Sequence, residues 1–375
     1  MTTLLPPPLA ETPALARLRA DVRAFLDEQI AAGVFTPDVD TWLNGFHPDF
    51  TRSLAERGWL GMTIPAEYGG HGRSFLERFV VTEELLAAGA PVAAHWIADR
   101  QAAPSLLKYG TEEQKQRYLP RITAGELFWA IGMSEPDSGS DLASVRTRGE
   151  RVEGGWRLTG TKVWTSGAHH AHAFFALART APLDPQHRHA GLSQFIVELD
   201  SPGVEIRPIR SMNGAHHFNE VHLEGVFVPD ELVIGTIGDG WAQVTSELSY
   251  ERSGPERFLS TYRLLAALAG RGLGDAETGA YVARLAGLHQ MSSAVAGALE
   301  HHQDVSSAAA VVKVLGTALE GDVADLADRL TEDDPGDPEL RALVARAVFH
   351  RPGFTLRGGT SEVLRGVIAR ELGLR

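Results

Sequence analysis

The apolar residues near the start of the chain recur at the spacing of an amphipathic helix. Turn signals at residues 65–72 and at Tyr109-Gly110 separate this helix from further helical segments. Thr111 precedes Gln114 by three residues, which predicts an N-cap and a capping box at the start of another helix. Residues 12 to about 125 are therefore predicted to be helical, and the first helix carries Leu15, Leu18, Val22, Phe25, Leu26 and Ile30 on its apolar face.

The pattern changes between about Leu127 and Leu232. Short runs with high strand propensity follow one another, such as KVWTS, AFFALART, SQFIVEL and VEIRPIR, and glycine, proline and aspartate separate them. This spacing is typical of an antiparallel sandwich or barrel. The alternation of strands and helices that builds a doubly wound nucleotide-binding sheet is absent from the sequence.

After Gly240 the helical period returns, with interruptions at Gly254-Pro255 and around residues 333–338. The order is therefore helical, strand-rich and helical. We expect an α+β multidomain protein, mainly α. Its parts are an N-terminal helical domain (1–126), a middle antiparallel β domain (127–235) and a C-terminal helical domain (236–375).

Composition limits the function classes. A chain of 375 residues with 43% hydrophobic residues can bury a large core. The net charge of −13 opposes a general nucleic-acid surface, which needs basic residues to neutralise phosphates. The absence of cysteine excludes disulfides, thiolate nucleophiles and cysteine zinc sites.

The sequence predicts a soluble, cytoplasmic protein without a metal. Proline and early acidic residues stand where a signal peptide would place a basic start and an apolar run, and no apolar stretch reaches 18 residues. The histidine groups lack the i, i+4 spacing of a helical zinc pair, so we interpret them as surface or loop residues. These groups are His169, His170 and His172, and His216 and His217.

A carboxylate lies next to a predicted helix break. Pro255 follows Glu251 by four residues and cannot donate the helical hydrogen bond to the Glu251 carbonyl, so the helix should kink or restart there. Two interpretations remain from these residues alone: a catalytic carboxylate at a break, or a solvent-facing glutamate in a charged helix.

Six motifs in order make the chain resemble the acyl-CoA dehydrogenase family, in the bacterial branch whose catalytic glutamate lies on a helix. The resemblance implies a helical domain, a β domain and a C-terminal four-helix domain. The motifs are GWLGMTIPAEYGGHG, LKYGTEEQKQRYLP, GMSEPDSGSDLASVRT, GTKVWTSGAHHA, VFVPDELVIG and GGTSEVLRGVIARELGLR.

The resemblance implies FAD as cofactor. Met133 and Ser134 resemble the residues that bind the pyrimidine side of the flavin, Trp164 resembles the flanking indole, and Thr165 and Ser166 stand at the N5 edge. Donors near N1 and O2 would favour the reduced flavin, because negative charge builds there. The alternatives are that Ser134 shapes a turn before a proline and that Trp164 belongs to the β-domain core.

Further residues are assigned by the same resemblance. Thr360 and Glu362 correspond to positions near the ribityl-pyrophosphate of FAD. Ser140 corresponds to a residue that meets the pantetheine or thioester end of the substrate, and Arg252 is a further candidate for substrate binding.

The resemblance also nominates the catalytic base. Many relatives carry it in an E-G-T turn, but here the turn reads Gly358-Gly359-Thr360, so the base should be Glu251, just before an arginine. A positioned carboxylate is needed because the α-proton of a thioester is weakly acidic. The backbone N–H of Gly358 would polarise the thioester carbonyl.

The implied activity is FAD-dependent α,β-desaturation of an acyl-CoA in lipid metabolism. An electron-transferring flavoprotein would accept the electrons, and a homotetramer or heterotetramer would be the assembly, with no nucleic acid or membrane as partner. Two further interpretations stay open: a non-catalytic or half-site partner subunit of a heteromeric enzyme, and a flavin monooxygenase or nitroalkane oxidase on the same fold.

Two departures from the family pattern imply weaker FAD binding or other contacts to FAD, and such losses also occur in subunits that work as half of a mixed tetramer. The R-x-x-F-G segment, whose arginine reaches a neighbour's FAD diphosphate, is replaced by LAGRGLGDAETGAY. The glutamine and paired-glycine loop at the adenine half is replaced by an acidic stretch around residues 331–340.

Overall fold

The computed structural model describes residues 5–251, 254–301, 303–332 and 337–374. By its internal contacts the chain divides into two compact units. The first unit comprises Met1–Phe50, Arg73–Ala93 and Glu251–Arg375, and the second comprises Thr51–Gly72 and Ala94–Tyr250. The chain passes from the second unit to the first for the last time between Tyr250 and Glu251, so the predicted base lies at a crossing point.

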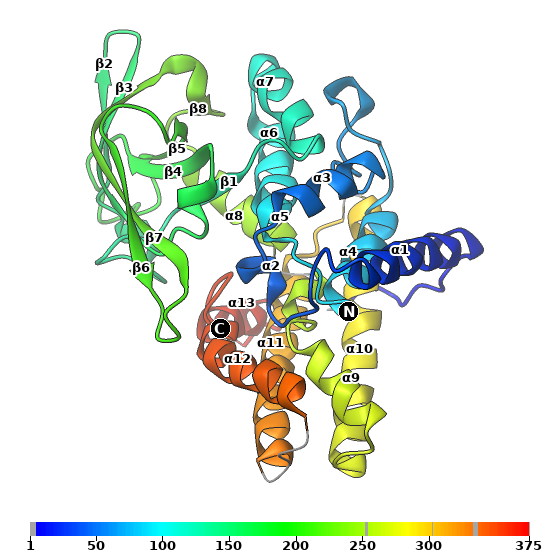
Figure 1. Ribbon diagram of the computed structural model, residues 1–375. Coiled ribbons are helices and arrows are strands. Elements are labelled where there is room, and N and C mark those ends of the chain that lie inside the picture. Colours follow the sequence, from blue (N-terminus) through cyan, green and yellow to red (C-terminus); the bar gives the residue numbers. More distant parts are fainter. Residues whose placement is uncertain (1–4, 252–253, 302, 333–336, 375) are drawn as a thin grey trace. The chain divides into compact units, whose positions relative to one another are not determined.

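The second unit contains the sheet, labelled in Figure 1. Its strands run in the order β6-β7-β3-β2-β4-β5-β8, and β1 pairs with β4. The strands are β1 (Trp129–Gly132), β2 (Arg148–Val152), β3 (Gly155–Lys162), β4 (Ala173–Arg179), β5 (Leu192–Glu198), β6 (Val204–Arg210), β7 (His216–Pro229) and β8 (Val233–Ile234).

The predicted antiparallel β domain is confirmed, with one addition. Neighbours along the sheet are antiparallel except where β1 and, at a single pair, β2 run parallel to β4. The β4 run AFFALAR is buried at six of its seven positions, as expected for a strand covered on both faces. The outer strand β6 carries Pro208, which an edge strand tolerates because its N–H is not needed in the ladder.

Helices complete the second unit. The capping box predicted at Thr111 and Gln114 is confirmed at the start of α7. The α-helices are α6 (Ala103–Tyr109), α7 (Glu112–Thr123) and α8 (Gly240–Glu251). A π-helical turn spans Ala98–Ala102, and 3-10 turns lie at Ala66–Tyr68, Leu142–Ser144, Ala168–His170 and Asp230–Leu232. Two further helices, α3 (Pro48–Glu56) and α5 (Ala93–Ile97), lie where the chain crosses between the units.

The first unit is built from helices. The long helix α11 contacts α9, α10, α12 and α13, and α4 contacts both α1 and α10. The bounds are α1 (Pro13–Ala31), α2 (Thr41–Asn44), α4 (Phe75–Ala87), α9 (Tyr262–Gly270), α10 (Asp275–Glu300), α11 (Ser306–Thr331), α12 (Pro338–Phe354) and α13 (Ser361–Glu371), with a 3-10 turn at Pro255–Arg257.

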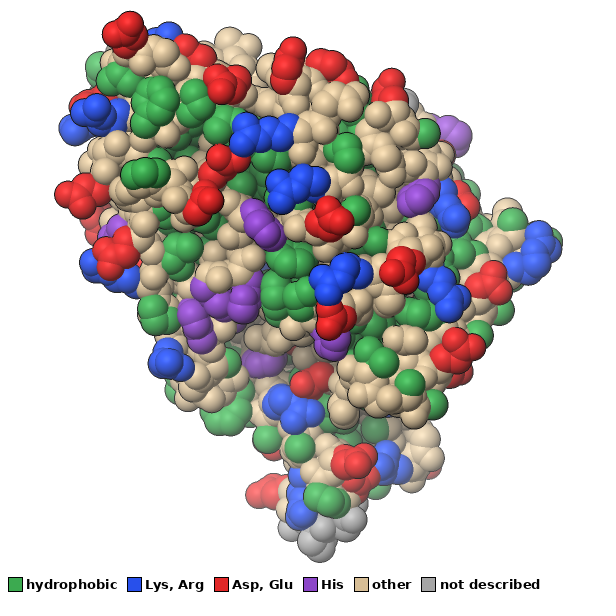
Figure 2. Space-filling view, turned by 45° about the horizontal axis from the view of Figure 1, so that its top comes forward, with side chains coloured by type: hydrophobic (Ala, Val, Ile, Leu, Met, Phe, Trp, Pro, Cys, Tyr) green, Lys and Arg blue, Asp and Glu red, His purple; other side chains and the backbone are tan. Residues whose placement is uncertain are grey.

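The predicted helix break at Gly254-Pro255 is confirmed. Helix α8 ends at Glu251, and the next described turn begins at Pro255, as the missing proline N–H requires. No helix within the described ranges is both long enough and apolar enough to cross a bilayer. Acidic and basic side chains are intermixed on the face shown in Figure 2.

Buried charges fix the segment before Gly358 in the first unit. Arg357 Nη1 donates to both carboxylate oxygens of Asp40, at 2.8 and 2.9 Å, and His350 Nδ1 lies 3.3 Å from Asp40 Oδ2. Asp40 is 3% exposed and has φ of 56°, so it combines a buried charge with a left-handed backbone. Lys313, fully buried on α11, donates to the Thr355 carbonyl at 2.9 Å.

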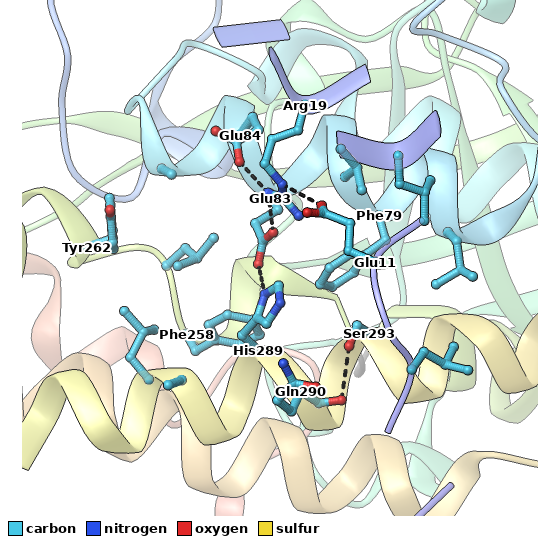
Figure 3. A pocket seen from close by; sticks show the side chains of 18 of the residues that line it. Glu11, Arg19, Phe79, Glu83, Glu84, Phe258, Tyr262, His289, Gln290 and Ser293 are labelled. Atoms are coloured by element: carbon cyan, nitrogen blue, oxygen red, sulfur yellow. Dashed lines mark hydrogen bonds and ion pairs between the residues drawn. The ribbon is translucent and has the colours of Figure 1, made fainter. Parts of the chain in front are cut away.

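A second ionic network joins three helices around a cavity of about 630 Å³ in the same unit. Figure 3 shows Arg19 of α1 directed at Glu83 and Glu84 of α4 and at Glu11, while His289 of α10 approaches Glu83. Apolar side chains from α1, α4 and α10 line the cavity too, including Phe79, together with Phe258, which lies between the 3-10 turn at Pro255–Arg257 and α9. The hydrogen bond to Glu83, opposed by burial, raises the pKa of His289.

We expect Asp40→Asn to destabilise the first unit strongly. Asparagine tolerates the left-handed backbone, so the variant tests the lost charge, which leaves the part-buried Arg357 without its hydrogen-bonded carboxylate. Removing one partner of a buried pair costs about 3–5 kcal/mol in free energy of unfolding, measurable by urea denaturation. Glu277→Gln is the control, because its pair with Arg329 is more than half exposed and should contribute at most ~1 kcal/mol. Equal losses for the two variants would contradict the assignment.

The His289–Glu83 pair should make stability pH-dependent. Because the folded-state pKa of His289 is raised above 6.5, its stabilising contribution is fully present below pH 6.5 and is lost as the pH rises through the folded value. The difference in free energy of unfolding between wild type and His289→Gln should therefore shrink with increasing pH. In a Glu83→Gln background the raised pKa loses its cause and burial lowers the pKa of His289 instead, so the shrinkage with increasing pH should disappear or reverse. A difference that stays constant with pH in the wild-type background would refute the coupling.

Candidate functional site

The two motifs assigned to flavin binding meet in the second unit. The Val163 N–H donates to the Ser134 carbonyl at 2.9 Å, and Lys162 Nζ donates to the Met133 carbonyl at 3.2 Å. Residues 133–134 and 163–164 therefore lie side by side, directly after β1 and β3. Met133 and Ser134 are half-buried.

A buried ion pair holds these motifs together. Lys162 is fully buried and donates to Glu135 Oε1 at 2.8 Å, while the backbone N–H groups of Arg146 and Thr147 donate to the same carboxylate at 2.6 and 2.9 Å. Burial lowers the pKa of Lys162 to about 8. Burial alone would raise the pKa of Glu135, but the Lys162 charge and the backbone donors outweigh it, so this pKa is lowered. The two side chains form a buried salt bridge.

The sequence reasoning did not single out Glu135 or Lys162. A signal was present in the alternation along β3, where Trp156, Leu158 and Lys162 all occupy buried positions of one parity. An inward-facing lysine requires a carboxylate partner, and Glu135 stands in the neighbouring motif.

Trp164 is exposed and its backbone is strained. The KVWTS run does not continue as a strand: β3 ends at Lys162, and Trp164 adopts φ of 58°, in the left-handed region that bulky residues avoid. The Trp164 side chain is 58% exposed and meets Phe218 edge-on at 5.7 Å between ring centroids. The alternative that Trp164 is an ordinary core residue is therefore wrong. Strained residues of this kind concentrate at functional sites.

The predicted residues Thr165, Ser166 and Ser140 differ in their exposure to solvent. Thr165 is fully buried, and its Oγ1 makes no hydrogen bond to the described part of the chain. Ser166 is half-buried. Ser140 is exposed in the turn where Ser138 and Ser144 donate to the Asp141 carbonyl at 2.8 and 2.7 Å.

The remaining predicted residues belong to the first unit. Gly358 and Gly359 have φ of 67° and 88°, a conformation that explains glycine at both positions. Thr360 is the N-cap of α13 and accepts from the Val363 N–H at 3.3 Å, and Glu362 lies exposed in the first turn. Glu251 is described only as the last residue of α8, and Arg252 lies outside the described residues.

The residues of the second unit fit the FAD that the resemblance implies. An exposed indole beside half-buried Met133, Ser134 and Ser166 offers an apolar face next to hydroxyl and backbone donors, which suits a planar ring with a polar edge. The unpartnered Thr165 hydroxyl is a further polar group at this turn, although a ligand would reach it only after a local shift.

Two other features do not coincide with the predicted site. None of the predicted site residues lines the cavity of Figure 3. Across the described ranges, no group of three or more histidine or acidic side chains is placed to hold a metal ion.

Two family models match the sequence. "Acyl-CoA dehydrogenase, N-terminal domain" matches residues 12–126, and "Acyl-CoA dehydrogenase, middle domain" matches residues 130–226.

Among curated relatives, acyl-CoA dehydrogenase FadE34 of Mycobacterium tuberculosis is 37% identical over 332 residues. The alignment covers 85% of this chain but 45% of the relative, so the chain spans about half the length of that protein. Acyl-CoA dehydrogenase FadE29 of the same organism is 32% identical over 384 residues, with 96% of each chain covered.

Solved structures agree. The Tcur3481-Tcur3483 steroid ACAD is 30% identical, with a TM-score of 0.83 and 97% of this chain and 98% of that chain covered. The ChsE4-ChsE5 complex from Mycobacterium tuberculosis is also 30% identical, with a TM-score of 0.77 and coverage of 98% and 99%. Similarity in sequence along nearly the whole chain, in both domain models and in fold means that this protein belongs to the acyl-CoA dehydrogenase family.

Proposed function

We propose that this chain is an FAD-dependent acyl-CoA dehydrogenase that introduces an α,β double bond into an acyl-CoA thioester. The observation that carries the proposal is the strained, exposed Trp164, which lies next to Ser134 in the second unit because the Val163 N–H donates to the Ser134 carbonyl. A bulky residue with positive φ destabilises the fold by on the order of 1–3 kcal/mol. Such a conformation is retained where it serves a function, and here it would present the indole for a ligand to stack on.

The proposed cofactor contacts follow the family resemblance. Met133, Ser134, Trp164, Thr165 and Ser166 would hold the flavin ring, with the Ser134 hydroxyl as donor. Thr360 and Glu362 would lie toward the ribityl-pyrophosphate. When bound, FAD would supply the hydride acceptor for the β-carbon of the substrate.

Glu251 is the proposed base that removes the α-proton. It ends α8 at the break imposed by Pro255, and Gly358 removes the usual alternative carboxylate. The backbone N–H of Gly358 would donate to the thioester oxygen and stabilise the charge that develops there. Ser140 and Arg252 would contact the CoA-bearing part of the substrate. An electron-transferring flavoprotein in the cytoplasm would take the electrons.

A second candidate function is a half-site subunit in a heteromeric tetramer. The R-x-x-F-G and adenine-loop segments of the family are replaced in this sequence. The similarity to the ChsE4-ChsE5 complex, an assembly of two named components, supports this candidate. The isolated chain would then be colourless and would acquire flavin only together with its partner, whereas the first candidate requires near-stoichiometric FAD in the isolated protein.

Glu251→Gln should abolish dehydrogenation while FAD stays bound. Losing a positioned base costs about 100-fold or more in rate, because proton abstraction loses its acceptor. The measurement is bleaching of the flavin band by a panel of acyl-CoA esters that includes short, long and steroid-derived acyl groups. Glu247→Gln, one helical turn earlier in α8, is the matched control and should retain activity. Bleaching at the wild-type rate in Glu251→Gln would remove Glu251 from the mechanism.

Substitution at Gly358 should impair turnover even without a new charge. At φ of 67° the left-handed backbone is unfavourable for both alanine and glutamate, so either residue should destabilise the turn by roughly 1 kcal/mol or more and shift its position. Gly358→Ala measures this strain, so any further loss in Gly358→Glu reports the second carboxylate. In a Glu251→Gln background, Gly358→Glu should exceed Gly358→Ala in kcat. If the two double variants are equally inactive, the two positions do not serve the same substrate carbon.

A further inference from the structure

The turn that carries Trp164 is joined to the start of β7 by backbone hydrogen bonds. The Thr165 N–H donates to the Asn219 carbonyl at 3.0 Å, and the Asn219 N–H donates to the Thr165 carbonyl at 3.1 Å. The Gly167 N–H donates to the His217 carbonyl at 2.9 Å. Residues 165–167 therefore lie alongside the first residues of β7 and are hydrogen-bonded to them, although they belong to no strand themselves.

The side chain of Asn219 adds the contacts that are specific to this turn. It is fully buried, and Nδ2 donates to the Thr165 carbonyl at 3.0 Å. The same amide nitrogen meets Nδ1 of His169 at 3.0 Å, and Oδ1 meets Nε2 of His216 at 2.8 Å. This pattern fixes the amide, because a rotated amide would place its oxygen against the Thr165 carbonyl oxygen.

The two histidines keep complementary roles in this network. With the amide in this orientation, His169 Nδ1 accepts and His216 Nε2 donates, so His169 is neutral. Burial, and then the neighbouring His170 and His216, lower the pKa of His169 to about 4, which preserves the acceptor at neutral pH. The His169 ring stacks on the His216 ring at 3.9 Å and 20° and also contacts His170 at 3.9 Å. Histidines gather in one area of the face in Figure 2.

The turn needs such a support because its backbone conformation is unfavourable by itself. Trp164 would relax toward negative φ if the following peptide were free to rotate. The Thr165 N–H, which belongs to the peptide after Trp164, donates to the Asn219 carbonyl. The Thr165 carbonyl receives both the backbone N–H and the side-chain Nδ2 of Asn219, and these two bonds hold the next peptide, between Thr165 and Ser166, in place.

We propose that Asn219, oriented by His169 and His216, is the positioning residue that holds Trp164 and Ser166 in the orientation required to bind the flavin. This inference rests on the proposed function, in which these two residues contact FAD. Asn219 has no exposed surface and cannot touch the cofactor itself, so it acts through the Thr165 carbonyl.

Three variants separate this role from packing. Asn219→Asp keeps the shape and the acceptor toward His216 but loses the donor toward Thr165. Asn219→Ala removes the whole amide. His169→Phe keeps a ring in the stack and removes the acceptor that orients the amide. Val228→Ala, at the far end of β7 and 1% exposed, is the control for general loss of core stability.

The readouts are the FAD dissociation constant, kcat and KM for the acyl-CoA, and hydrogen exchange of the amides in residues 163–168. We expect Asn219→Ala and Asn219→Asp to weaken FAD binding about tenfold. They should lower kcat with little change in KM and accelerate exchange at Thr165 and Gly167. His169→Phe should show a smaller change in the same direction, and Val228→Ala should leave FAD affinity and exchange in the turn unchanged.

The outcomes distinguish this inference from the proposed function. If wild type binds FAD and both Asn219 variants bind it with wild-type affinity, the positioning role is overturned. It is also overturned if Val228→Ala weakens FAD binding as much as they do. If wild type binds no FAD, alone or with a partner subunit, the proposed function fails. Hydrogen exchange in the apo chain then still tests whether Asn219 holds the turn, and unchanged exchange in Asn219→Ala refutes that as well.

Discussion

The buried ion pair between Glu135 and Lys162 is the constraint on which the candidate flavin site depends. The Lys162 side chain has no exposed surface and the Glu135 side chain is 7% exposed, and each charge would be strongly destabilising without the other. The pair joins the segment after β1 to the end of β3, so Met133, Ser134 and Trp164 are brought together by charges outside the proposed contacts. The two backbone N–H groups that also bind Glu135 extend this constraint to Arg146 and Thr147.

In the first unit, buried charges also fix the backbone next to the turn that contains Gly358. Asp40 with Arg357, and Lys313 with the Thr355 carbonyl, fix the chain just before two glycines of positive φ. Irregular backbone has few repeating hydrogen bonds of its own, so buried charges and side-chain caps give it a single conformation. Loss of such a charge is expected to affect both the stability of the unit and the geometry of the turn.

The proposed chemistry is divided along the chain. The ring-binding residues belong to the second unit, whereas Glu251 and Gly358 belong to the first, and α8 carries the chain from one to the other. The absence of the family's diphosphate and adenine segments would bear on how tightly the proposed FAD is held. The identity of the base depends instead on Glu251 and Gly358. Flavin content and catalysis can therefore be tested separately in this chain. The half-site candidate makes a statement about flavin content.

The sequence by itself determined the features that depend on neighbours a few residues apart. These are the helical period of α1, the capping box at Thr111 and the break before Pro255. Only the tertiary structure decided the exposure and strained backbone of Trp164, the Glu135–Lys162 pair and the Asn219 network. The last two of these join residues far apart in sequence, 27 positions for the ion pair and 54 for Asn219 with Thr165. Periodicity reports which face of an element is apolar, but the partner of a buried polar group is set by how the strands pair.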